Sequence, residues 1–99
     1  MELPTKIKVG EKWYSVDIAE TMQKKRWMGS TNYGDQRIRI GKRSNVTGKD
    51  FSPTQIKETF WHELTHAILY DMGSPLYTNE QFVHEFSKRL NKSIISARF

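Results

Sequence analysis

The segment His62–His66 places two imidazoles four residues apart, with Glu63 directly after the first of them. Each residue of an α-helix advances about 100° around the axis, so side chains four apart stack on one face, with Cβ atoms about 6 Å apart. Two imidazoles at this spacing can bind one metal ion, and Glu63 lies close enough to reach a water molecule beside it. This is the H-E-x-x-H pattern, which predicts His62 and His66 as zinc ligands and Glu63 as the general base of a peptide hydrolysis.

Two further residues are candidates for the third protein ligand that such a zinc site needs. The chain has no cysteine and three histidines, so the ligands must be imidazoles and carboxylates. Glu80 opens a second predicted helix, and His84 follows four residues later on the same face. If the helices pack antiparallel, either side chain can return to the histidine pair. We expect Glu80 to complete the site; His84 would then support a histidine ligand or, in the alternative, replace Glu80.

The first predicted helix carries clear start and stop signals. Ser52 is a favourable N-cap, Pro53 suits the first helical position, and Gln55 completes a capping box. The helix should run to about residue 72, where Gly73 favours its end. Its apolar side chains lie roughly opposite the two histidines, so this helix should pack one face on the core and present the other to a cleft.

The second predicted helix starts near Thr78, which is placed as an N-cap with Gln81 in the capping-box position. It should extend to about Asn91 or a few residues further. Its apolar residues recur at helical spacing: Phe82, Val83, Phe86 and Leu90. The connection between the helices is short, so we expect them to fold back on one another as an antiparallel pair.

The first half of the chain is typical of β-strands. Residues 6–9, 13–18 and 37–40 alternate polar with apolar side chains or are rich in aromatic and β-branched residues. Residues 19–26 fit a helix or a strand, and residues 29–35 contain glycine and asparagine typical of turns. The predicted fold class is α+β: a small N-terminal antiparallel β-sheet of three to four strands, then an active-site helix and an antiparallel helix carrying Glu80. Residues 1–99 suit a single domain.

Charge and hydropathy restrict the partners and the location that we expect. The formal net charge is +5, but the basic residues form small groups without a nucleic-acid-binding motif, so a solvated surface is the simpler interpretation. The sequence has no apolar run long enough for a membrane span, and residues 1–6 do not have the apolar stretch of a signal peptide. We therefore expect a cytoplasmic protein that does not bind membranes; its oligomeric state stays open.

The two helices resemble those of a known family of zinc peptidases. Residues 62–67 are similar to the active-site helix of thermolysin-like gluzincins, and Asn79-Glu80 is similar to their glutamate helix. The resemblance implies that Glu80 is the third zinc ligand. It places His84 where the family has a carboxylate that supports a histidine ligand, which is a departure from the family pattern.

The wider chain, roughly residues 6–92, resembles small phage and bacterial metallo-endopeptidases of the ImmA/IrrE type and other minimal gluzincins. The similar residues before the active-site helix are Gly29 to Tyr33, Gln36 and Ile38 to Ile40. In such enzymes a strand binds the substrate by strand addition, which implies substrate-binding roles for Ile38, Arg39 and Ile40. If the protein is phage-encoded, it would act in the host cytoplasm.

The expected function is zinc-dependent hydrolysis of a peptide or protein substrate. Tyr33, Tyr70 and Tyr77 are candidates for the group that stabilises the oxyanion. Two alternatives are a catalytically silent zinc-binding domain and a phage or bacterial regulatory accessory protein acting on a DNA-associated partner. A latent peptidase is a third, in which the tail, residues 94–99, occupies the cleft.

Overall fold

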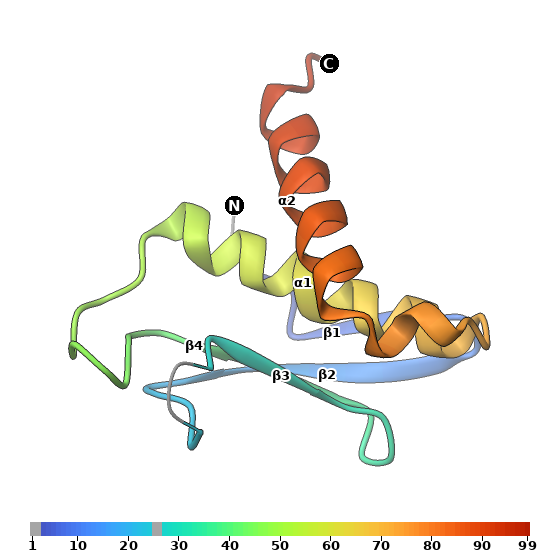
Figure 1. Ribbon diagram of the computed structural model, residues 1–99, viewed down its shortest axis with the longest axis horizontal. Helices are drawn as coiled ribbons and strands as arrows, with labels where there is room; N and C mark the ends of the chain where they lie inside the picture. The colour runs from blue at the N-terminus through green and yellow to red at the C-terminus, as the bar shows by residue number, and fades with distance from the viewer. Residues whose placement is uncertain (1–2, 25–26) are drawn as a thin grey trace.

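The structure, a computed structural model, describes residues 3–24 and 27–99, and it confirms the α+β fold class. Two helices follow a four-stranded sheet, with α1 lying across one face of it (Figure 1). The strands are β1 (Lys6–Val9), β2 (Lys12–Ala19), β3 (Gly29–Asn32) and β4 (Arg37–Gly41). The helices are α1 (Pro53–Asp71), the short 3-10 helix η1 (Pro75–Thr78) and α2 (Glu80–Ser96).

The sheet is mixed, so the expectation of an antiparallel sheet was wrong for one pair of strands. The strand order is β1-β2-β4-β3, with β2 and β4 parallel and the other two pairs antiparallel. After β2 the chain passes beyond the position of β4, forms β3 at the edge, and turns back to insert β4 between β2 and β3. Two parallel neighbours need such a crossing connection, which hydrophobic alternation alone does not indicate.

Strand β3 forms where the sequence indicated only turns. Glycine, serine and asparagine are poor strand formers, but this segment pairs with β4 in register from Gly29 opposite Ile40 to Asn32 opposite Arg37. Tertiary pairing therefore overrides local propensity. In the ambiguous segment 19–26, Ala19 ends β2 and residues 20–24 form neither helix nor strand, whereas residues 25–26 lie outside the described part.

The core lies between the sheet and α1. Alternate residues of β2 and β4 point toward α1, which contributes Phe60, Leu64 and Ala67. Ile38 and Ile40 are fully buried in this core, and β4 has a strand on each side. Their expected substrate-binding role is therefore wrong, because strand addition needs a free edge. Arg39 alternates to the exposed side of the same strand, so β4 does not supply the expected substrate-binding edge.

The start of α1 confirms the capping prediction. The Ser52 hydroxyl accepts a hydrogen bond from the Gln55 backbone N–H, and the Gln55 side chain accepts one from the Ser52 N–H. The start of α2 differs by one residue, because Asn79 and not Thr78 is its N-cap. Pro75 begins the intervening 3-10 helix, which includes Thr78 and so moves the start of α2 forward.

Helix α2 crosses α1 steeply and runs out from the body of the protein, rather than lying antiparallel beside it (Figure 1). It contacts α1, and its buried residues are Val83, Ser87 and Asn91. Residues 92–96 of the helix are exposed, and Phe99, which follows the helix, is fully exposed. The tail therefore lies away from α1 and does not fill a cleft there.

The turn between β1 and β2 offers a test of its backbone conformation. Gly10 has φ +60°, and a Cβ at this position would collide with the carboxylate of Asp71 at the end of α1. Gly48 has φ +73° with no atom within 4 Å of the corresponding Cβ position. We expect Gly10→Ala and Gly48→Ala each to cost about 1–2 kcal/mol of unfolding free energy from backbone strain, because the exposed Asp71 carboxylate can move away from a Cβ at position 10. Urea denaturation of both variants measures these losses; a Gly10→Ala variant as stable as the native protein would contradict the left-handed backbone conformation of this turn.

Candidate metal centre

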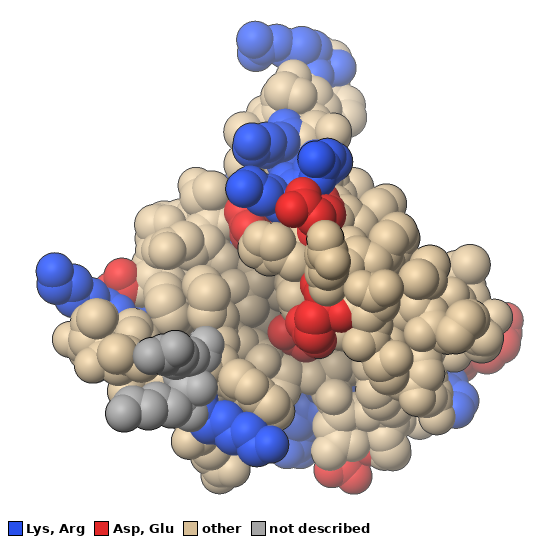
Figure 2. Space-filling model, viewed as in Figure 1, with Lys and Arg blue, Asp and Glu red and all other residues tan. Residues whose placement is uncertain are grey.

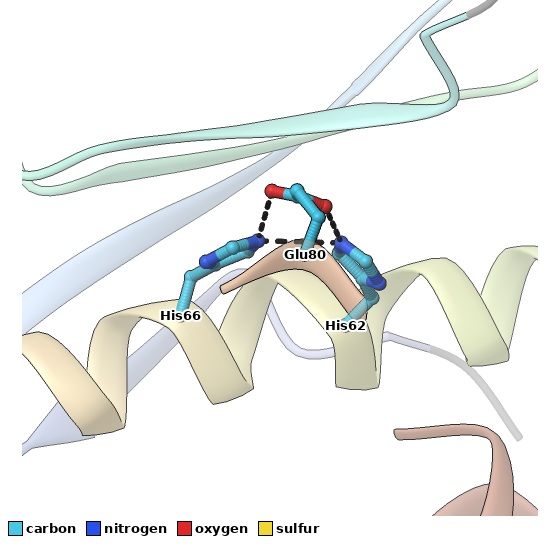
Figure 3. Close-up of side chains that lie close together, drawn as sticks. All are labelled: His62, His66 and Glu80. Atoms are coloured by element: carbon cyan, nitrogen blue, oxygen red, sulfur yellow. Dashed lines mark hydrogen bonds and ion pairs between the residues drawn. The ribbon is translucent and has the colours of Figure 1, made fainter. Parts of the chain in front are cut away.

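Three side chains converge at the crossing of α1 and α2. The Nε2 atoms of His62 and His66 lie 3.3 Å apart. The Glu80 carboxylate spans both of them, with Oε2 3.1 Å from His62 Nε2 and Oε1 2.9 Å from His66 Nε2 (Figure 3). Among the described residues this is the one group of three or more histidines and acids with all ligand atoms within 4.8 Å of one another. The group can therefore hold a metal ion.

The spacing of the three ligand atoms fits a tetrahedral ion. Ligand atoms that each lie about 2.0–2.1 Å from such an ion are about 3.3 Å from one another. The two histidine nitrogens lie 3.3 Å apart, and each is within 3.1 Å of a different Glu80 oxygen. With one ligand atom taken from each residue, all three atoms lie within 4.8 Å of one another. Small movements of the side chains would therefore suffice to accommodate the ion.

The hydrogen bonding of His66 gives a second reason to place a cation here. Its Nδ1 lies 2.7 Å from the backbone carbonyl oxygen of Tyr77, which can only accept, so Nδ1 carries the proton. Nε2 of the same ring lies 2.9 Å from Glu80 Oε1, which is an acceptor. This nitrogen therefore either donates a second proton to the carboxylate or shares a cation with it. The carbonyl thus orients His66 as an outer-shell partner orients a metal ligand.

Burial adjusts the ionisation of the residues around the cluster. It lowers the pKa of His62, and the neighbouring His66 acts in the same direction. A lowered pKa favours the neutral imidazole, which is the form that binds metal. Burial also raises the pKa of Glu63 to about 7, although the hydrogen bond from Thr31 opposes this. Glu63 therefore has a proton affinity suited to accepting and returning a proton near neutral pH.

His84 lies at the edge of the site. Its ring centroid is 6.4 Å from that of His62, and it is outside the group whose ligand atoms converge. Helix α2 brings it to the same side as Glu80, one turn further along. The geometry thus favours Glu80 over His84 as the third ligand, with His84 beside His62.

An open cleft of about 880 Å³ lies over the cluster. Its walls come from β3, from the face of α1 that carries Glu58, His62 and Glu63, and from the start of α2. Figure 2 shows acidic side chains around the hollow of this face, whereas lysine and arginine gather along the projecting helix and at the lower rim. The cluster is therefore accessible from solvent.

The three candidate tyrosines differ in their position relative to the cleft. Tyr33 and Tyr77 line the cleft, whereas Tyr70 stacks on Tyr33 with ring centroids 4.2 Å apart. Burial, reinforced by the nearby Glu63, raises the pKa of Tyr33 to about 12. Its hydroxyl therefore keeps its proton at neutral pH and remains available as a hydrogen-bond donor in the cleft.

Sequence reasoning did not single out the contact of Thr31 with Glu63. Its hydroxyl lies 2.8 Å from Oε1 of Glu63, across 32 positions of sequence. A threonine between a glycine, a serine and an asparagine matches no catalytic motif. The resemblance drawn for Gly29 to Tyr33 includes Thr31, but the turn-forming residues concealed the strand that brings it to Glu63.

Comparison with protein-family models, curated proteins and solved structures gives no match for this chain. The resemblance to gluzincins therefore stays a prediction, and the metal centre depends on its own geometry. Within the described residues, neither helix has the length and apolar character that crossing a membrane requires.

Proposed function

We propose that the protein is a zinc-dependent metallopeptidase of minimal gluzincin type. The observation that carries this proposal is the convergence of His62, His66 and Glu80 next to the buried carboxyl group of Glu63, at the wall of an open cleft. Metal ligands alone would suit a structural site. A buried glutamate directly beside them, in a cleft that a peptide can enter, supports hydrolysis.

Zinc is the metal that this donor set suits best. Two imidazole nitrogens and one carboxylate form the ligand set of many catalytic zinc sites, which keep a further position open. When bound, zinc would lower the pKa of a water molecule and polarise the carbonyl of the scissile peptide. His62, His66 and Glu80 would hold it.

The other steps belong to side chains of this chain. Glu63 would accept a proton from the attacking water and then donate it to the leaving amine, so it ends each cycle ionised. Tyr33, which keeps its proton, would donate a hydrogen bond to the oxyanion, with Tyr77 as the alternative. Strand β3 forms an edge of the sheet and lines the cleft, so its free side would pair with the substrate backbone.

Zinc binding should appear as a gain in stability. Zinc at a free concentration of 100 times its Kd should raise the unfolding free energy by about 2.7 kcal/mol. Thermal denaturation of metal-free protein with and without added zinc measures this as a rise in Tm. The His62→Ala/His66→Ala double variant is the control, because it lacks two of the three ligands. An equal rise in Tm in that variant would place the zinc elsewhere.

Activity can be tested without knowledge of the substrate. Zinc-loaded protein is incubated with a diverse peptide mixture, and new amino termini are identified by mass spectrometry. We expect cleavage that a chelator abolishes and that zinc restores. A zinc-bound, folded protein that cleaves none of these peptides would instead favour a silent zinc-binding domain.

A further inference from the structure

Strand β3 contacts the turn of α1 that carries Glu63. The Thr31 hydroxyl oxygen lies 2.8 Å from Glu63 Oε1 and 3.0 Å from the backbone carbonyl oxygen of the same residue. Gly29 lies two positions earlier, on the same face of the strand. A Cβ there would lie only 3.1 Å from Cγ of Glu63 and closer still to Thr59. The missing side chain of Gly29 therefore lets β3 approach α1 closely enough for Thr31 to reach the carboxyl group.

We propose that Thr31 is a positioning residue for the catalytic base, an inference that rests on the peptidase function proposed above. Its hydroxyl fixes Oε1 of Glu63 and leaves Oε2 as the oxygen that takes the proton. No described residue donates a hydrogen bond to Oε2, and Glu63 lines the cleft. The base would therefore present one defined oxygen to the attacking water.

The two acceptors near Thr31 suit a base that changes its charge during the reaction. A threonine hydroxyl has one proton to donate. While Glu63 is ionised, this proton makes a charge-assisted hydrogen bond to Oε1. After Oε2 takes the proton of the attacking water, the single Thr31 proton can stay on Oε1 or turn to the Glu63 carbonyl oxygen, because both acceptors lie within 3.0 Å of the hydroxyl. The carboxyl group can then pass its proton to the leaving nitrogen without rotating.

Thr31 also connects the base to the expected substrate strand. The Gly41 N–H donates to the Met28 carbonyl oxygen at 2.7 Å, which makes these two residues a hydrogen-bonded antiparallel pair. Hydrogen-bonded and non-hydrogen-bonded pairs alternate along two antiparallel strands. In this register Ser30 and Asn32 form hydrogen bonds with β4, whereas the backbone N–H and C=O of Thr31 point to the free edge of the sheet. A peptide paired with that edge would bond to the backbone of the residue whose hydroxyl holds Glu63.

The test compares Thr31→Val, which keeps the side-chain shape but removes the hydroxyl, with Thr31→Ser, which keeps the hydroxyl. In zinc-loaded protein we expect Thr31→Val to lower kcat about tenfold to a hundredfold, with KM and zinc content nearly unchanged. Thr31→Ser should restore most of kcat. The matched control is Thr65→Val, since Thr65 is a buried residue of α1 whose hydroxyl bonds to the Trp61 carbonyl oxygen and does not line the cleft.

Two results in these assays would overturn the proposal: a kcat loss that Thr31→Ser does not restore, or a parallel loss of zinc. A stability measurement, which does not depend on peptide cleavage, tests this inference independently of the proposed function. In metal-free protein, the shift of the denaturation midpoint caused by Thr31→Val should be smaller when Glu63 is already alanine. Equal shifts in both backgrounds would show that Thr31 does not hold Glu63, even if the native protein cleaves no peptide.

Discussion

Glu63→Gln should abolish peptide cleavage while the protein keeps its zinc. The amide cannot accept a proton, so the loss of general-base catalysis should lower kcat by about 10²- to 10⁴-fold. The side-chain carbonyl oxygen of the introduced glutamine can still accept the hydrogen bond from Thr31, so the local geometry should persist. Zinc content by elemental analysis and kcat on any peptide that the native protein cleaves are the two measurements.

A measurement of stability distinguishes the loss of general-base catalysis in Glu63→Gln from misfolding of the variant. Glu63 is only 7% exposed, and burial raises its pKa, so replacing it with a neutral isostere removes an unfavourable buried charge at alkaline pH. We therefore expect the variant to unfold no more readily than the native protein. Glu11→Gln, in the exposed turn between β1 and β2, makes the same change of charge away from the cleft and should keep full activity. Retained cleavage in Glu63→Gln would remove the general-base assignment.

Glu80→Ala should release the metal, whereas His84→Ala should retain it. Glu80 supplies both of its carboxylate oxygens to the histidine pair, while His84 lies outside the converging group. Loss of a residue that only supports a ligand typically costs 10- to 100-fold in metal affinity. We expect His84→Ala to fall within about that range and Glu80→Ala to exceed it, as measured by competition with a chelator of known affinity.

The fold should tolerate both substitutions. The Glu80 side chain is 72% exposed, so its removal creates no cavity, and its favourable position at the start of α2 is worth only about 0.3–1 kcal/mol. Metal-free Glu80→Ala should therefore have nearly the Tm of the metal-free native protein. Loss of metal in His84→Ala with retention in Glu80→Ala would reverse the choice of third ligand.

The sequence predicted the convergence of His62, His66 and Glu80 better than it predicted the sheet, and for a physical reason. His62, His66 and the caps of α1 obey local rules, because helix geometry and capping depend on residues a few positions apart. Predicting that Glu80 lies near the two histidines required one further assumption, that a short connection brings the second helix back to the first. The steep crossing of α2 still brings this residue to the histidines, because it is the first residue of the helix.

The errors arose where distant segments decide the structure. The parallel pairing of β2 with β4 and the formation of β3 depend on partners that the local sequence does not reveal. Alternation correctly predicted that one face of β4 is buried, but not that both of its edges are paired. The substrate-binding role was therefore given to Ile38 and Ile40, while the free edge beside the cleft belongs to the strand before them.

The position of Thr31 has a consequence for the order in which the site assembles. His62 and Glu80 are 18 positions apart, whereas Thr31 and Glu63 are 32 apart and meet only when the sheet docks on α1. Contacts between nearer residues close smaller loops and form earlier at lower entropic cost. During refolding in the presence of zinc, we expect a metal-loaded helical pair to form before the sheet docks on α1. Uptake of the ion and the onset of the proposed activity should then be kinetically separate events.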